Sequence, residues 1–211
     1  MGLFLVVSVP LWFLLVVSFY RTPSRGWRGL FVPFLGGMVT GMAVLVVTLG
    51  ALTRSPFGME WPRLFRWAWV RGPGMAGLAA AVVVTAVYAR KATSYSRLRE
   101  ISAWFAGTAF PYLVWKALSP DPGFDGYRVL LAPIVWIAAF GSAAWIIERG
   151  LRQDGWMKYI LAVGSAVFVT LFTLVPAAYA AGERLIAWIL AVVFAVGSTF
   201  LAFLDSRGRF S

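Results

Sequence analysis

Long apolar runs separated by short polar segments recur along almost the whole chain, and this pattern predicts a helical membrane protein. An α-helix needs about 20 apolar residues to cross a bilayer, which is close to the length of each run. No polar stretch is long enough to fold separately, so we expect a single transmembrane domain over residues 1–211, an all-α polytopic bundle. The predicted spans, seven with a six-span arrangement as the alternative, cover residues 2–20, 29–52, 73–89, 101–118, 128–147, 158–181 and 184–204.

Residues 53–72 fit neither a span nor an ordinary loop. Four arginines are interleaved there with phenylalanine, leucine and tryptophan, and prolines interrupt the segment. Basic residues mixed with aromatic ones are typical of a short helix in the headgroup region of the membrane. The pattern therefore predicts an interfacial helix, and a gating or docking element on the membrane surface is the functional alternative.

The last three predicted spans each contain a Gly-Ser pair, with the serines at Ser142, Ser165 and Ser198. If the spans alternate in direction, the three pairs lie at a similar depth from the same membrane face. Small residues let helix backbones approach closely, and serine hydroxyls can bond to a neighbouring helix. We expect these helices to form the packed centre of the bundle, with the pairs either closely packed or lining a narrow permeation path.

Other small residues and a proline mark further packing features. Gly37 and Gly41 have the four-residue spacing that permits a tight helix crossing. Ala76 and Ala80 repeat this spacing in a span so rich in glycine and alanine that we expect it to lie among other helices. Pro176, near the end of the sixth span, predicts either a passive kink or a hinge that exposes carbonyl groups to a cavity.

The chain is 61% hydrophobic and only 13% charged, against about a quarter in soluble domains. Its formal net charge is +11, which in a soluble protein could indicate a nucleic-acid partner. Here the basic residues lie almost entirely at the ends of the apolar runs. At those places they set topology and contact anionic lipids, so we expect membrane lipids and no nucleic acid as partners.

The distribution of basic residues also predicts an orientation. Twelve of them follow the first, third or fifth span or lie in the C-terminal tail, whereas seven follow the second, fourth or sixth span. The positive-inside rule then places the N-terminus outside and the C-terminus in the cytoplasm, with the inverted orientation as the alternative because of the arginines in residues 53–72. Alanine-rich spans with many tryptophans are typical of a bacterial inner membrane protein.

The chain contains neither histidine nor cysteine, which excludes histidine acid–base chemistry, thiolate nucleophiles and Cys/His metal sites. All eight acidic residues fall at span ends or in loops. Glu148 could lie deeper in its span, but its neighbour Arg149 favours a solvated helix end. Proton- and sodium-coupled carriers usually place a carboxylate within the membrane, so a coupled carrier is disfavoured. We expect no enzyme, no cofactor and no metal site.

Lys116 is the one basic residue well inside an apolar run, and Tyr112 precedes it by one helical turn. An ionisable group within the membrane is a functional hypothesis by default. The alternative is that the Lys116 ammonium snorkels to the nearby interface. Our candidate substrate-binding residues are Lys116 and Tyr112, together with Ser142, Ser165 and Ser198.

No motif in the chain identifies a known family, so function is an expectation from chemistry alone. The small-residue helices and hydroxyl groups favour a protein that binds or passes a small solute or lipid, as a channel, an uncoupled transporter or a transporter subunit. It would act alone, as a homo-oligomer or with partner membrane subunits. An accessory or scaffolding subunit is the alternative, and would present a free small-residue face. A lipid-modifying enzyme is the second alternative, and would require Asp121 and Asp125 to converge with arginines.

Overall fold

The computed structural model describes residues 28–51, 59–89, 97–118, 131–153 and 155–207, and this part of the chain contains helices and no strand. The predicted all-α class is therefore confirmed. The first predicted span, residues 2–20, lies outside the described residues, as do Asp121 and Asp125. The helices are α2 (Arg28–Ala51), α3 (Trp61–Arg71), α4 (Pro73–Tyr88), α5 (Arg97–Leu118), α6 (Ala132–Leu151), α7 (Met157–Leu171), α8 (Leu174–Ala180) and α9 (Arg184–Arg207).

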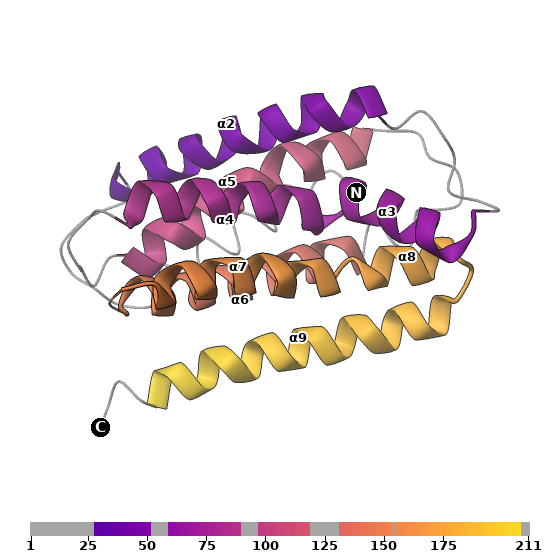
Figure 1. The fold of residues 1–211 in the computed structure, drawn as a ribbon. Coiled ribbons are helices and arrows are strands. Elements are labelled where there is room, and N and C mark those ends of the chain that lie inside the picture. Colours follow the sequence, from indigo (N-terminus) through magenta and orange to yellow (C-terminus); the bar gives the residue numbers. More distant parts are fainter. Residues whose placement is uncertain (1–27, 52–58, 90–96, 119–130, 154, 208–211) are drawn as a thin grey trace.

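The long helices lie side by side and alternate in direction (Figure 1). Helix α2 packs mainly against α5, and α9 packs against α6 and α8, so that α2 and α9 form the two outer sides. Helix α4 contacts α2, α3, α5, α6 and α7. The prediction that the Gly- and Ala-rich segment lies among other helices is thus confirmed, and the reason is its low side-chain bulk.

Three helical segments are long and apolar enough to cross a membrane by length and composition: Gly29–Leu49, Ile134–Leu151 and Met157–Ala180. A fourth is added if α3 and α4 are counted as one span, bent by 49°. The described apolar part of α9, Arg184–Ser198, is shorter. Helix α5 is long but carries several charged residues, Arg97, Arg99, Glu100 and Lys116, and it is not among these segments.

Large apolar side chains cover the outward faces of the bundle. A soluble protein rarely exposes a continuous apolar surface of this kind, whereas a lipid environment requires one. Many of these exposed side chains lie on α2, α7 and α9, among them Phe31, Val32, Val39, Val46, Val47, Val163, Val167, Leu185, Val192, Val193 and Val196.

Helices α2 and α5 cross at backbone contact, and glycines on both helices make this crossing possible. A Cβ atom added at Gly37 would lie 2.0 Å from the carbonyl oxygen of Trp104, and one at Gly107 would lie 2.0 Å from the carbonyl oxygen of Phe34. Gly41, one turn beyond Gly37, also faces the α5 backbone. The tight crossing predicted from the Gly37 and Gly41 spacing is confirmed.

The described part of the segment predicted to be interfacial, residues 59–72, contains α3, which ends at a break before α4. Gly72 has an extended backbone at the break and donates its N–H to the Ala68 carbonyl oxygen at 2.7 Å. Pro73 then begins α4, where its missing N–H costs no helix hydrogen bond. Helix α3 is amphipathic, with Leu64 buried and Arg63 exposed.

A second break divides the span predicted at residues 158–181 into α7 and α8. Pro176 has no N–H to donate to the Phe172 carbonyl four residues earlier. That carbonyl accepts the N–H of Val175 instead, at 3.3 Å, and Thr173 bonds to Thr170 with the same three-residue spacing at 3.1 Å. The discontinuity predicted from Pro176 is therefore present one turn upstream of the proline. Helix α3 contacts α8 and α4 contacts α7, so the two broken helices pack against each other.

Candidate functional site

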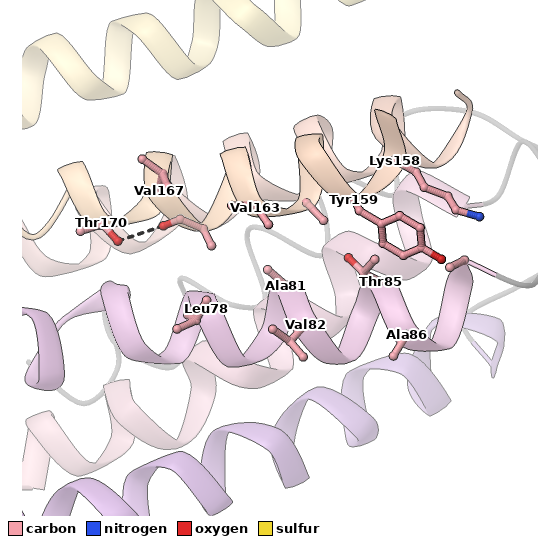
Figure 2. Close-up of a pocket in the computed structure, with 13 residues that line it drawn as sticks. Leu78, Ala81, Val82, Thr85, Ala86, Lys158, Tyr159, Val163, Val167 and Thr170 are labelled. Carbon is pink, nitrogen blue, oxygen red and sulfur yellow. Dashed lines mark hydrogen bonds between the residues drawn. The ribbon is translucent and has the colours of Figure 1, made fainter. Parts of the chain in front are cut away.

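A groove with a volume of about 590 Å³ lies between α4 and α7. Figure 2 shows side chains from both helices directed into it. Its walls are mostly alanine and valine, with two threonines and, near the start of α7, Tyr159 and Lys158. Leu78 and Thr170 lie toward the opposite end (Figure 2).

The groove exists because small residues face each other across the two helices. Residues four apart in sequence lie on one face of a helix, one turn after another. Both helices place such a stripe of small side chains along the groove, and neither stripe fills the space left by the other. The stripes are Ala81 and Thr85 on α4, followed by Ala89 just after the end of that helix, and Ala162, Ala166 and Thr170 on α7.

Close helix contact bounds the groove at one end. A Cβ atom at Gly77 would lie 2.5 Å from Cγ1 of Val169, so α4 and α7 touch there. Near this contact the Nε1–H of Trp69, in α3, donates to Thr170 Oγ1 at 3.2 Å. The Thr170 hydroxyl in turn donates to the Ala166 carbonyl at 2.9 Å. The polar groups at this end are therefore paired with each other.

Thr85 differs from Thr170 because its hydroxyl has no partner. The residue is 8% exposed, and its Oγ1 makes no hydrogen bond within the described part of the chain. A buried hydroxyl without a partner is uncommon, because its desolvation is not compensated. Thr85 lies on the wall of the groove, and its side chain is on the side of α4 that faces α7 (Figure 2).

A cation and an aromatic ring lie at the other end of the groove. The Nζ atom of Lys158 is 5.1 Å from the centre of the Tyr159 ring. Lys158 is partly buried, and Tyr159 is exposed. Both follow the first residue of α7, and the antiparallel α4 ends at the same end of the bundle (Figure 1). The groove is therefore apolar along its length, with a positive charge at one end.

The three serines predicted to bind substrate do not line this groove. Ser165 is buried and donates to the Ala162 carbonyl at 2.6 Å, and the partly buried Ser198 donates to the Ala195 carbonyl at 2.9 Å. Ser142 is buried in α6 with no hydrogen-bond partner among the described residues. Their hydroxyls lie on three separate helices, and two of them bond to their own helix.

The glycines next to two of these serines face open space. A Cβ atom at Gly164 or Gly197 would meet no atom within 4 Å. The expectation that these two Gly-Ser pairs allow close helix approach is therefore wrong. The reason is helix rotation, because Gly164 in α7 and Gly197 in α9 lie on outward faces, whereas Ser165 is buried.

Tyr112 is buried in the core between α2, α5 and α6. Its ring centre is 5.2 Å from that of Trp136, and its hydroxyl is 3.4 Å from Thr48 Oγ1. The Thr48 hydroxyl donates its proton to the Leu45 carbonyl at 2.8 Å, so Tyr112 is the donor to Thr48. These contacts link helices within the core. Lys116 lies in α5, and its side chain is outside the described residues.

Glu148 is 2% exposed, so the prediction of a solvated helix end is wrong. Helix α6 continues to Leu151, which places Glu148 one turn inside the helix. Arg152 Nε donates to Glu148 Oε1 at 2.6 Å and forms an ion pair with it. A buried carboxylate is thus present in a segment long enough to span a membrane. Among the described residues, no group of three or more acidic residues could hold a metal ion.

The polar residues of the groove, Thr85, Tyr159, Lys158 and Thr170, were not among the sequence-based candidates. The available signal was the four-residue spacing of small residues in both helices. That spacing is more often associated with close packing, so it does not by itself identify a cavity. No protein family, curated protein or solved structure matches this chain.

Proposed function

We propose that the protein is an integral membrane protein that binds a lipid in the groove between α4 and α7. The observation that carries this proposal is the Thr85 hydroxyl, which has no hydrogen-bond partner among the described residues and is buried in the wall of a mostly apolar groove of about 590 Å³. Ligand-binding pockets in proteins typically have volumes of about 300–1,000 Å³, with apolar walls and few polar groups. The groove has both properties.

Residence in a membrane is supported by the apolar helices and by their outward faces. In the proposed topology, the described helices and residues 2–20 together cross the membrane seven times. The end of the bundle with Lys158 is cytoplasmic, and α3 lies in the outer headgroup region. Basic residues at the Lys158 end, which include Arg99, Arg149 and Arg152, favour this orientation.

The environment of the groove favours a lipid over a water-soluble solute. Val163 and Val167 line the groove and are among the exposed side chains of α7, so an acyl chain can enter sideways from the bilayer. Lipid tails are as apolar as these valines, so an acyl chain that moves from the bilayer into the groove gains almost no hydrophobic free energy. Retention then depends on van der Waals contact with both helices and on hydrogen bonding to Thr85.

The position of the small residues supports a scaffolding subunit less than it supports a lipid-binding protein. Such a subunit would offer Gly37, Gly41, Ala76 and Ala80 to a partner, but all four are buried within this chain. The lateral position of the groove also favours binding over conduction through a central path.

The test is retention of lipid by the full-length protein, purified in mild detergent and examined by native mass spectrometry. Val163→Trp fills the groove from a residue that is 64% exposed, so it should not disturb the core. Val193→Trp is the matched control, because Val193 is 57% exposed on α9 and does not line the groove.

The wild type and the Val193→Trp variant should retain lipid, and the Val163→Trp variant should lose it. Circular dichroism establishes that all three proteins are helical. Equal lipid retention by all three folded proteins would rule out the groove as the binding site.

A further inference from the structure

We infer that the lipid in the groove is an anionic phospholipid whose phosphate lies beside Lys158. Its acyl chain runs along the valines toward Thr170, and its ester carbonyl accepts a hydrogen bond from Thr85. This inference rests on the proposed function and adds the chemical class and the direction of the ligand.

The length of the groove indicates a ligand from one leaflet. Lys158 and Thr170 are both wall residues of α7. At 1.5 Å per residue, they are about 18 Å apart along the helix. The hydrocarbon core of a bilayer is about 30 Å thick, so the groove reaches from one interface to slightly past the midplane. A lipid anchored at Lys158 therefore fits with its tail ending near the Gly77 and Val169 contact.

In the described part of the chain, the positive charge of Lys158 is not neutralised by a carboxylate. Its ammonium lies over the Tyr159 ring, and no carboxylate within the described residues pairs with it. The nearby Arg152, by contrast, is paired with Glu148. An ammonium at the membrane interface attracts phosphate, and it favours lipids whose headgroup has no compensating positive charge.

The position of Thr85 indicates which group of the lipid lies just below its phosphate. It lies three residues before Tyr88, the last residue of α4, at the end of the bundle where α7 begins. Its hydroxyl is thus about one turn deeper than the helix end, or roughly 5 Å. The ester carbonyls of a glycerolipid lie just below its phosphate, so they can reach Thr85 while the phosphate reaches Lys158. A free fatty acid has no carbonyl below its carboxylate and would leave Thr85 unpaired.

The experiment is a titration of the delipidated full-length protein with phosphatidylglycerol and phosphatidylcholine of the same acyl composition, followed by native mass spectrometry. The wild type should bind phosphatidylglycerol about fivefold more tightly, the effect expected for one basic residue at the surface. Lys158→Gln should remove this preference and Lys158→Arg should keep it. Arg149→Gln, a charge change at the same end of the bundle but outside the groove, is the control and should keep it as well.

Thr85→Val should weaken binding of both lipids and leave their ratio unchanged. A wild-type protein that binds both lipids equally, with no change in Lys158→Gln, would overturn the headgroup assignment and leave lipid binding in the groove intact. Failure to bind either lipid above the level of Val163→Trp would overturn the proposed function itself.

A photo-crosslinking residue in place of Val167 identifies the occupant directly, in the full-length protein reconstituted in vesicles of phosphatidylglycerol and phosphatidylcholine. Crosslinks to phosphatidylglycerol support the inference. Crosslinks to residues 1–27 of the same chain would overturn both proposals, because the chain itself would then fill the groove. Crosslinks to a second protein molecule would overturn them in favour of a docking surface.

Discussion

Replacement of Gly37 by alanine tests the central packing contact of the fold. The added Cβ atom would lie 2.0 Å from the Trp104 carbonyl oxygen. Non-bonded heavy atoms are at their optimal separation at about 3.5 Å, so the new atom would be roughly 1.5 Å too close. The atom that it meets is backbone, so no side-chain rotation relieves the clash. Helices α2 and α5 must move apart, and overpacking of this kind typically costs about 1–3 kcal/mol.

Gly107→Ala makes the reciprocal change on α5, where the new Cβ atom would lie 2.0 Å from the Phe34 carbonyl oxygen. We expect each single variant to lower the free energy of unfolding by about 2 kcal/mol. The double variant Gly37→Ala/Gly107→Ala should lose less than the sum, because a separation caused by one alanine makes room for the other.

The assay is unfolding in mixed micelles of mild detergent and sodium dodecyl sulfate, followed by circular dichroism and tryptophan fluorescence. Gly164→Ala and Gly197→Ala are the controls, since a Cβ atom at either site meets no atom within 4 Å. These controls should be neutral or gain up to about 1 kcal/mol from better helix propensity. If Gly37→Ala is as harmless as Gly164→Ala, then α2 does not lie against α5 at the described distance and the reasoning fails.

Three further predictions concern the polar groups of the bundle. Thr85→Val should reduce lipid retention. It should leave the free energy of unfolding unchanged or higher by up to about 1 kcal/mol, because it removes a buried hydroxyl that has no partner among the described residues. A loss of stability in the same micelle assay would contradict this. Trp69→Phe removes the hydrogen bond to Thr170 and should cost about 1 kcal/mol, and a double-mutant cycle with Thr170→Val should give a coupling energy of at least about 0.5 kcal/mol. Zero coupling would mean that the two side chains do not bond. Arg152→Met leaves the buried carboxylate of Glu148 without its cation and should cost about 1–3 kcal/mol, most of which Glu148→Gln in the same chain should restore. No recovery in the double variant would indicate that Arg152 stabilises the protein through packing alone.

Local features of the chain were sufficient to predict most of the helices. The apolar runs correspond to α2, α4, α5, α6 and α9 with differences of a few residues at their ends. Gly72 and Pro73 separate α3 from α4, and Pro176 accounts for the break between α7 and α8. Each of these features acts through the chain's own backbone or through neighbours within one helical turn, so the sequence contains the necessary information.

Burial and cavities were not predictable in the same way. Glu148 next to Arg149 resembles a solvated helix end, yet α6 continues past it and turns its side chain inward. Gly37 and Gly164 are both glycines within apolar runs, but one faces a helix backbone and the other faces open space. Which of these outcomes occurs depends on the rotation of each helix and on the helix that packs against it.

The sequence by itself determined the all-helical class, the approximate helix boundaries and the two helix breaks, because hydrophobic length, glycine and proline act locally. Only the tertiary structure decided where the groove lies. A stripe of small residues packs tightly when the opposite helix offers bulk, as at Gly77 and Val169, and leaves space when the opposite stripe is also small. Thr85 and the alanines of α7 are small on both sides, so space is left between them. The candidate site therefore results from the pairing of two helices that are about 80 residues apart in the chain.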